Sequence, residues 1–399
     1  MKRAFQCVLL ALLVASLSIL TGCWNYKELE SHYIVSGIAI DKGKQGHRYH
    51  LTFEVLDIAG DGQSGTLKGK LIRADGDTIA DAVDNASRIS DKELYYSDCK
   101  AVIFSRQIAR EGLIPVMDWL NRDPKPRFTV QIFVSLEETA EELFEPGGQS
   151  GGQSGSQAGG QSGGQAGEGT VISMQIANSM EAASTGRQSI QMHLYDVDNV
   201  LLGEGRDLVL PGLRKSGQKT PQVEVDGTAV FREDKYVGEL DDELTKNFLL
   251  LMNNLQTGTL LVGQKPEEKN IALLIRNSSV EVNPEVNGGK IGMKIKMKME
   301  CSFDEENSYR NYLLDLGANR IEGFAKNTLR KQIEELVRQV QTEFGCDIFG
   351  FGRKISQENP KEWQKLKPSW REKFRTVSVD VEPDILIVNA EFAHPKGYT

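Results

Sequence analysis

The sequence has few of the residues on which common active sites depend. Five histidines and five cysteines are spread over 399 residues, and no two cysteines form a CxxC pair. No HExxH, Walker A or EF-hand motif occurs, so no metal site, phosphate-binding loop or zinc knuckle is indicated. No serine, histidine and aspartate can be singled out as a catalytic set. We therefore predict a protein that is not an enzyme, with no cofactor and no metal.

Long apolar runs and positive charge are also scarce. Beyond the N-terminal segment, no stretch approaches the roughly 20 apolar residues that span a bilayer. Acidic residues outnumber basic ones, 56 to 47, which gives a formal net charge of −9. Such a surface offers no electrostatic reason to bind nucleic acid or anionic lipid. Hydrophobic content of 39% and charged content of 26% fit a folded globular chain, and the length predicts two or three domains.

The N-terminal segment is the exception to this pattern. Two basic residues precede an apolar run from Val8 to Leu20, which is followed by Gly22 and Cys23. The run is short for a membrane span and typical of a signal-peptide core. A small residue before a cysteine at this place resembles a bacterial lipobox. The resemblance implies cleavage between Gly22 and Cys23 and a diacylglyceryl group on the Cys23 thiol, which would anchor the chain to a membrane. The alternative is an uncleaved signal anchor with an incidental cysteine.

Three cysteines lie far apart in the rest of the chain: Cys99, Cys301 and Cys346. Cys99 and Cys301 fall in strand-like patterns, which favours small buried hydrophobic side chains. The sequence leaves open one disulfide bond among the three.

A repetitive segment divides the chain. Residues 147–166 consist of five tetrapeptides of Gly, Gln, Ser and Ala, which cannot bury enough apolar surface to fold. We predict a signal peptide at 1–22, an N-terminal α/β domain at 23–145, a flexible loop at 146–169, a middle α+β domain at 170–270 and a C-terminal α+β domain at 271–399.

The predicted N-terminal domain alternates strands and helices, which indicates a mixed sheet. Strands are predicted at 34–40, 49–56, 99–104 and 128–134. One helix is capped by Asp77 or Thr78 and has an apolar face that ends at Ile89, and a second helix covers about 108–120.

The predicted middle and C-terminal domains are α+β. The middle domain should contain a hairpin, 223–231 with 236–240, followed by a helix to about residue 255. In the C-terminal domain, apolar residues and lysines alternate over 291–300, which predicts a strand with one buried face. A long helix follows over 321–344 and ends at Gly345. Two closing strands, 376–381 and 385–392, are expected on either side of Pro383, in an antiparallel sheet covered by helices on one side.

Several short motifs in a fixed order carry a family resemblance. Trp24 follows Cys23 directly, and a G-x-x-x-D pattern places Gly37 and Asp41. The segment GTAVF at 227–231 comes later, and DIFGFG at 347–352 comes near the end. In this order the motifs resemble the spore-germination receptor C-subunit lipoproteins, the Ger(x)C family. The resemblance covers nearly the whole chain after the signal segment and leaves out the Gly/Gln array.

The resemblance implies a non-enzymatic subunit of a nutrient germinant receptor. It implies membrane-embedded A and B subunits as partners and the outer face of the spore inner membrane as location, and it brings no catalytic residues. Motif residues that either contact a partner or serve the fold are Gly227, Phe231, Gly238, Phe349, Gly350, Phe351 and Gly352. Glycines most often occur where the backbone conformation requires a residue without a side chain. The alternative function is a lipoprotein outside the cytoplasm that binds a small ligand itself.

Overall fold

The computed structural model describes eleven stretches of the chain. They are residues 5–6, 31–56, 69–122, 126–145, 171–186, 189–216, 222–255, 257–263, 270–287, 290–306 and 316–388. Gly22, Cys23 and the Gly/Gln array lie outside these residues. Within the described stretches, none of the helices combines the length and the apolar character that a membrane crossing needs.

Nine strands form the first sheet, in the order β3-β2-β1-β5-β6-β7-β8-β9, with β4 paired to β1. Their bounds are β1 (His32–Lys42), β2 (Tyr49–Leu56), β3 (Gly69–Gly76), β4 (Glu93–Tyr95), β5 (Ala101–Phe104), β6 (Gln131–Ser135), β7 (Val209–Ser216), β8 (Gln222–Arg232) and β9 (Lys235–Leu240). The neighbours β1, β5, β6 and β7 run parallel, and the outer strands pair antiparallel. The strands predicted at 34–40 and 49–56 and the hairpin after residue 222 are confirmed.

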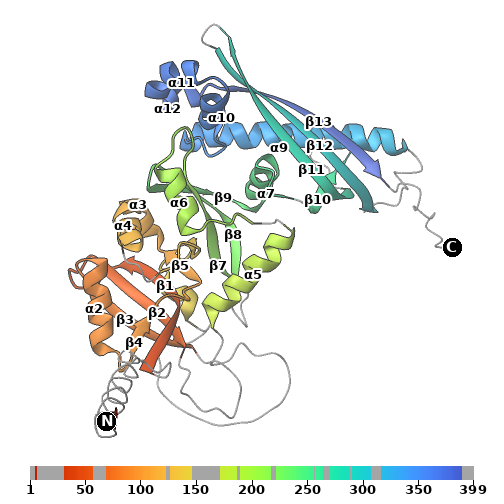
Figure 1. Ribbon diagram of the computed structural model, residues 1–399. Helices are drawn as coiled ribbons and strands as arrows, with labels where there is room; N and C mark the ends of the chain where they lie inside the picture. Colours follow the sequence, from red (N-terminus) through yellow and green to blue (C-terminus); the bar gives the residue numbers. More distant parts are fainter. Residues whose placement is uncertain are drawn as a thin grey trace, which may run out of the picture.

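Helices cover both faces of this sheet (Figure 1). They are α2 (Ile79–Ile89), α3 (Arg106–Glu111), α4 (Ile114–Arg122), α5 (Ile172–Gly186), α6 (Leu194–Leu201) and the 3-10 turn η2 (Glu141–Phe144). Alternate residues of the central strands enter two different apolar cores, as Ile38 and Ala39 of β1 do. Burial on both faces explains why the parallel strands are continuously apolar.

Three details of the predicted N-terminal domain are wrong. The helix expected over 108–120 is two helices, α3 and α4, because Gly112 takes a φ of +125° between them. Ile89, expected on the buried face of α2, is 67% exposed at its C-terminal end. Phe128 is 60% exposed in the turn before β6, so the strand begins three residues later than expected.

The first sheet continues across the predicted loop at 146–169. Strand β6 precedes this loop and pairs in parallel with β7, which follows it, through Val134 opposite Gly212. Strands from the predicted N-terminal and middle domains therefore share one sheet, and the division into domains stays a prediction.

The second sheet has four strands in the order β10-β11-β12-β13. They are β10 (Gly258–Val262), β11 (Ile271–Asn287), β12 (Lys290–Glu306) and β13 (Ser378–Val388). Ile295, Met297 and Met299 of β12 are buried as expected, and the long helix α9 (Ala318–Gln339) lies along the sheet (Figure 1). On the opposite face the lysines meet acidic neighbours, for example Lys294 and Glu382 at 2.7 Å.

The closing part of the chain differs from the prediction. One strand, β13, replaces the two expected strands, and it runs parallel to β12, so the sheet is mixed rather than antiparallel. Pro383 is tolerated because β13 is an edge strand. On its free edge the Val381 carbonyl accepts from Arg330 and the Ile387 N–H donates to Glu322. Pro383 lies two residues after Val381 and four before Ile387, so it faces the same free edge, where a missing N–H costs no ladder bond.

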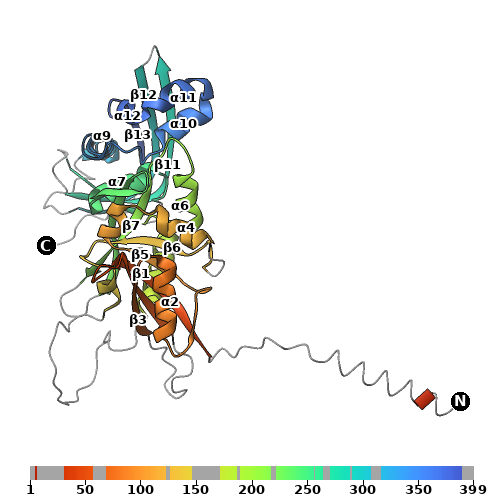
Figure 2. The same ribbon diagram turned by 90° about the vertical axis from the view of Figure 1, so that its left-hand side faces the viewer.

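Short helices and turns complete the fold. Helix α7 (Asp242–Leu251) follows β9, and after α9 come the π-helical turn η3 (Val340–Phe344), α10 (Phe351–Glu358), α11 (Pro360–Leu366), the 3-10 turn η4 (Lys367–Ser369) and α12 (Trp370–Phe374). Helices α10, α11 and α12 lie beside one end of the second sheet (Figure 1). Gly345 ends the long helix with a φ of +60°, as predicted. The two views show an elongated molecule with the start of β1 at the end opposite the second sheet (Figures 1 and 2).

Candidate functional site

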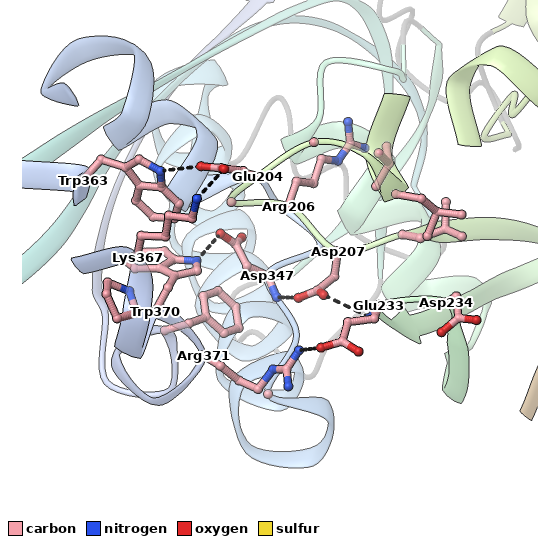
Figure 3. Close-up of a pocket in the computed structure, with 18 of the residues that line it drawn as sticks. Glu204, Arg206, Asp207, Glu233, Asp234, Asp347, Trp363, Lys367, Trp370 and Arg371 are labelled. Atoms are coloured by element: carbon pink, nitrogen blue, oxygen red, sulfur yellow. Dashed lines mark hydrogen bonds and ion pairs between the residues drawn. The ribbon is translucent and has the colours of Figure 1, made fainter. Parts of the chain in front are cut away.

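One cavity lies where the first sheet meets helices α11 and α12. It has a volume of about 510 Å³. Its walls come from the loop between α6 and β7, the β8–β9 turn and the segment from Trp363 to Phe374 (Figure 3). Segments far apart in sequence therefore build it together, so we take it as the candidate site.

Asp347 is the buried centre of this region. Its carboxylate accepts backbone N–H groups from Gly350, Phe351 and Gly352 at 2.7–3.0 Å and the Nε1–H of Trp370 at 3.0 Å. The first three bonds cap the N-terminus of α10, whose start also uses the positive φ of Gly350. Burial raises the pKa of Asp347 to about 7, although the four donors favour the charged form.

Five polar contacts join this region to the first sheet and the loop before β7. The backbone of Asp347 donates to the Asp207 carboxylate at 2.7 Å, and its carbonyl accepts from the Asp207 N–H at 2.8 Å. Arg371 donates to Glu233 at 3.0 Å. Trp363 donates to Glu204 at 3.3 Å, and Lys367 pairs with the same carboxylate. Figure 3 shows these partners facing one another across the cavity. Burial raises the pKa of Asp207.

Aromatic rings fill the space behind Asp347. Phe349 stacks on Phe351 with ring centroids 5.1 Å apart, and Trp363 meets Trp370 edge to face at 5.4 Å. A Cβ atom on Gly352 would lie 2.6 Å from the Trp370 Nε1 and 2.8 Å from the Trp363 ring. The FGFG part of the motif thus combines two packing rings with a glycine that leaves room for two tryptophans.

A substitution at Gly352 should therefore destabilise the protein. We expect Gly352→Ala to lower the free energy of unfolding by about 1–3 kcal/mol, because the new methyl group overpacks the tryptophan pair. Gly323→Ala is the matched control, since nothing lies within 4 Å of its Cβ position in α9, and it should stabilise the protein by about 0.5–1 kcal/mol. Chemical denaturation of both variants measures the difference. Equal effects of the two substitutions would contradict the packing argument.

The other motif residues lie in tightly packed surroundings. Phe231, Phe349 and Phe351 are buried. Gly227 has a φ of +69°, and a Cβ on Gly238 would lie 2.5 Å from the Phe344 ring. These residues meet neighbours within the described chain, and contact with a partner stays a prediction for them. Asp207 and Glu204 were not predicted, because no local pattern marks them and their partners Asp347, Trp363 and Lys367 lie 140 or more residues away.

The G-x-x-x-D motif holds the chain on both sides of the array segment. Asp41 accepts two backbone N–H groups at the start of η2, at 2.7 and 2.9 Å. Glu54, which was not predicted, accepts the first two N–H groups of α5 at 2.6 and 2.8 Å. A Cβ on Gly37 would lie 2.8 Å from Ser173 and 2.9 Å from Phe144. Gly37 therefore allows η2 and α5 to close over β1 next to each other.

The three cysteines in the described part of the chain lie in apolar surroundings. Cys99, Cys301 and Cys346 are free and buried, as the strand patterns of the first two predicted. Burial raises the pKa of Cys99 to about 12 and that of the other two to about 11, so the thiolate is disfavoured. Within the described stretches, no three His, Cys, Asp or Glu side chains are placed to hold a metal ion.

Two family models match the chain. The model "Spore germination protein N-terminal domain" matches residues 25–215, and "Spore germination B3/GerAC like, C-terminal" matches residues 226–391. Together they cover both sheets and the cavity.

Similar proteins match over nearly their full length. Spore germination protein KC of Bacillus subtilis (strain 168) is 24% identical over 96% of this chain and 95% of its own. Spore germination protein B3 of the same organism is 23% identical over 93% of this chain and 94% of its own. The crystal structure of the GerBC protein shares the fold, with a TM-score of 0.52 at 18% identity, over 92% of this chain and all of that one.

Proposed function

The chain belongs to the Ger(x)C family of spore germination proteins, and from this premise we propose that it is the lipid-anchored subunit of a nutrient germinant receptor. The observation that carries the proposal is the full-length match. Both family models align in order, and relatives named as spore germination proteins align over more than nine tenths of the chain.

The proposed anchor is a diacylglyceryl group on Cys23. The support is the sequence before it, a short apolar core that ends in Gly22 and Cys23. Two acyl chains give stable attachment where a single chain would give only marginal binding. The mature protein would then stand on the outer face of the spore inner membrane.

The proposed mode of action is contact with membrane-embedded A and B subunits rather than catalysis. The cavity described above supports this view, because its carboxylates are engaged by internal donors and no nucleophile with a base lies in its wall. The chain would transmit or stabilise a state of the receptor through its surface.

Co-purification tests the proposed partnership. The full-length tagged protein, extracted from spore membranes with mild detergent, should bring down the A and B subunits, and spores that lack it should not respond to the nutrient of that receptor. The control is a second receptor in the same spores, whose nutrient response should be unchanged. Normal germination without this subunit, with A and B intact, would contradict the proposal.

A further inference from the structure

Arg206 is a half-buried cation without a partner in the wall of the cavity. Its Nε atom is buried and makes no hydrogen bond. Across the part of the chain that the structure describes, no hydrogen bond or ion pair satisfies its guanidinium. The two other cations in the wall, Lys367 and Arg371, are both paired, with Glu204 and Glu233. Figure 3 shows the Arg206 guanidinium pointing away from the carboxylates of Glu204, Asp207 and Asp347.

A second arginine increases the unbalanced positive charge. The backbone N–H of Arg353 donates to the Gly205 carbonyl at 2.8 Å, which holds α10 beside the loop that carries Arg206. The Arg353 side chain is exposed and outside the cavity lining, and within the described residues it makes no hydrogen bond or ion pair either. Burial and the charge of Arg353 lower the pKa of Arg206, and the charges of Asp347 and Asp196 partly oppose this shift. Asp196 lies outside the cavity wall and already accepts the His193 N–H at 3.1 Å. Two neighbouring guanidinium groups, one of them partly buried, are unfavourable without an anion.

The acidic residues of the wall cannot supply this anion, because each is already engaged. Asp347 accepts four bonds, Asp207 accepts the Asp347 N–H, and Asp234 accepts the Ile114 N–H at 3.2 Å. Glu204 and Glu233 hold Lys367 and Arg371. The unused hydrogen-bonding groups of the cavity are therefore N–H donors. Such donors bind a group with lone pairs and negative charge.

The size and lining of the cavity restrict the ligand further. A volume of about 510 Å³ is in the range of small-molecule sites. Apolar wall residues are Ile114, Val200, Leu201, Leu208 and Phe374. The five acidic residues around the cavity disfavour a dianion such as phosphate, whereas a single carboxylate suits one guanidinium.

We propose that this cavity binds a small organic carboxylate, with the carboxylate on Arg206 beside Arg353 and an apolar body against Val200, Leu201 and Leu208. This site goes beyond the subunit function proposed above and does not depend on the lipid anchor or on partner subunits. An Asp or Glu side chain of another protein would present the same carboxylate, but a cavity of this size favours a free small molecule.

Calorimetric titration of the full-length protein in detergent micelles tests the site. Phenylacetate is the probe, and its uncharged analogue phenylacetamide reports apolar binding alone. We expect saturable phenylacetate binding that Arg206→Gln weakens by about tenfold or more, the effect of losing one charge-assisted hydrogen bond. Arg320→Gln, which removes an exposed arginine of α9, should bind like the wild type. Thermal melts of Arg206→Gln should show a fold at least as stable as the wild type, because an unpaired charge has been removed.

Three results would overturn the proposal. The first is absence of saturable binding, or binding that Arg206→Gln leaves unchanged. The second is an affinity for phenylacetamide equal to that for phenylacetate, which would show that the cavity does not recognise the carboxylate. An equal affinity for inorganic phosphate would likewise show that it does not recognise the apolar body. The third is tighter binding of N-acetylglutamate amide than of phenylacetate, which would indicate that an acidic side chain of another protein occupies the cavity.

Discussion

Replacing Cys23 with alanine should release the protein from the membrane. The lipobox-like segment places a single thiol where a diacylglyceryl group would attach, and no helix among the described residues is suited to cross a bilayer. Without the two acyl chains, the remaining acidic surface gives no compensating attraction to anionic lipid. In cells that lack the A and B subunits, fractionation should move most of the Cys23→Ala protein from the membrane to the soluble fraction. Metabolic labelling with an alkynyl fatty acid should fall to background.

Cys7→Ala is the matched control, because it removes a thiol from the same N-terminal segment. It should leave both membrane attachment and labelling unchanged. Retention of Cys23→Ala in the membrane would favour the alternative that the segment is an uncleaved anchor. In cells that contain the A and B subunits, membrane retention of Cys23→Ala would instead indicate attachment through these partners. The experiment therefore uses cells that lack them.

Removing the Asp347 carboxylate should be the most damaging single change in the candidate site. We expect Asp347→Ala to lower the free energy of unfolding by about 3 kcal/mol or more, because three backbone N–H groups and the Trp370 indole lose their common acceptor in a buried place. Asp84→Asn on the exposed face of α2 is the control and should change stability by about 0.5 kcal/mol or less. Urea denaturation gives both values. A loss below about 1 kcal/mol for Asp347→Ala would mean that water replaces the carboxylate.

The variant Asp347→Asn isolates the charge of this residue. In the folded protein the group holds its proton up to a pKa of about 7, whereas its ordinary value is 3.8. Between these values the unfolded chain binds fewer protons than the folded one, so the stability that Asp347 contributes falls as pH rises from about 4 to about 7. The stability of the wild type relative to Asp347→Asn should therefore decrease across this window in urea denaturation at a series of pH values. Parallel pH profiles would contradict the raised pKa.

Local patterns predicted much of the fold. The alternation of apolar residues and lysines placed β12, and the glycine after the long helix marked its end. Thr78 caps α2 through a side-chain bond to the Asp81 N–H, as a cap at the start of an apolar face should. Each of these features depends on residues within a few positions of one another.

Features that depend on distant partners were missed. The pairing of β6 with β7 joins residues separated by the array, and β7 carries no clear alternation. Pro383 suggested a break because a proline disrupts an inner strand, but only the complete sheet shows that β13 lies at an edge. Asp347 appeared as part of a motif, yet its role required Asp207, Trp370 and the backbone of α10 to come together.

The position of β1 has a consequence for how far the molecule reaches from a bilayer. Eight residue steps separate Cys23 from Ser31, and a fully extended chain covers at most about 3.6 Å per step, so the tether spans no more than about 29 Å. Strand β1 begins at the end of the molecule opposite the second sheet (Figures 1 and 2). A lipid on Cys23 would thus keep the first sheet close to the headgroups and hold the second sheet at a height above them. Inserting residues between Cys23 and Ser31 would change this height without altering either sheet. The germination response measured against the number of inserted residues would report the distance from the membrane at which the subunits make contact.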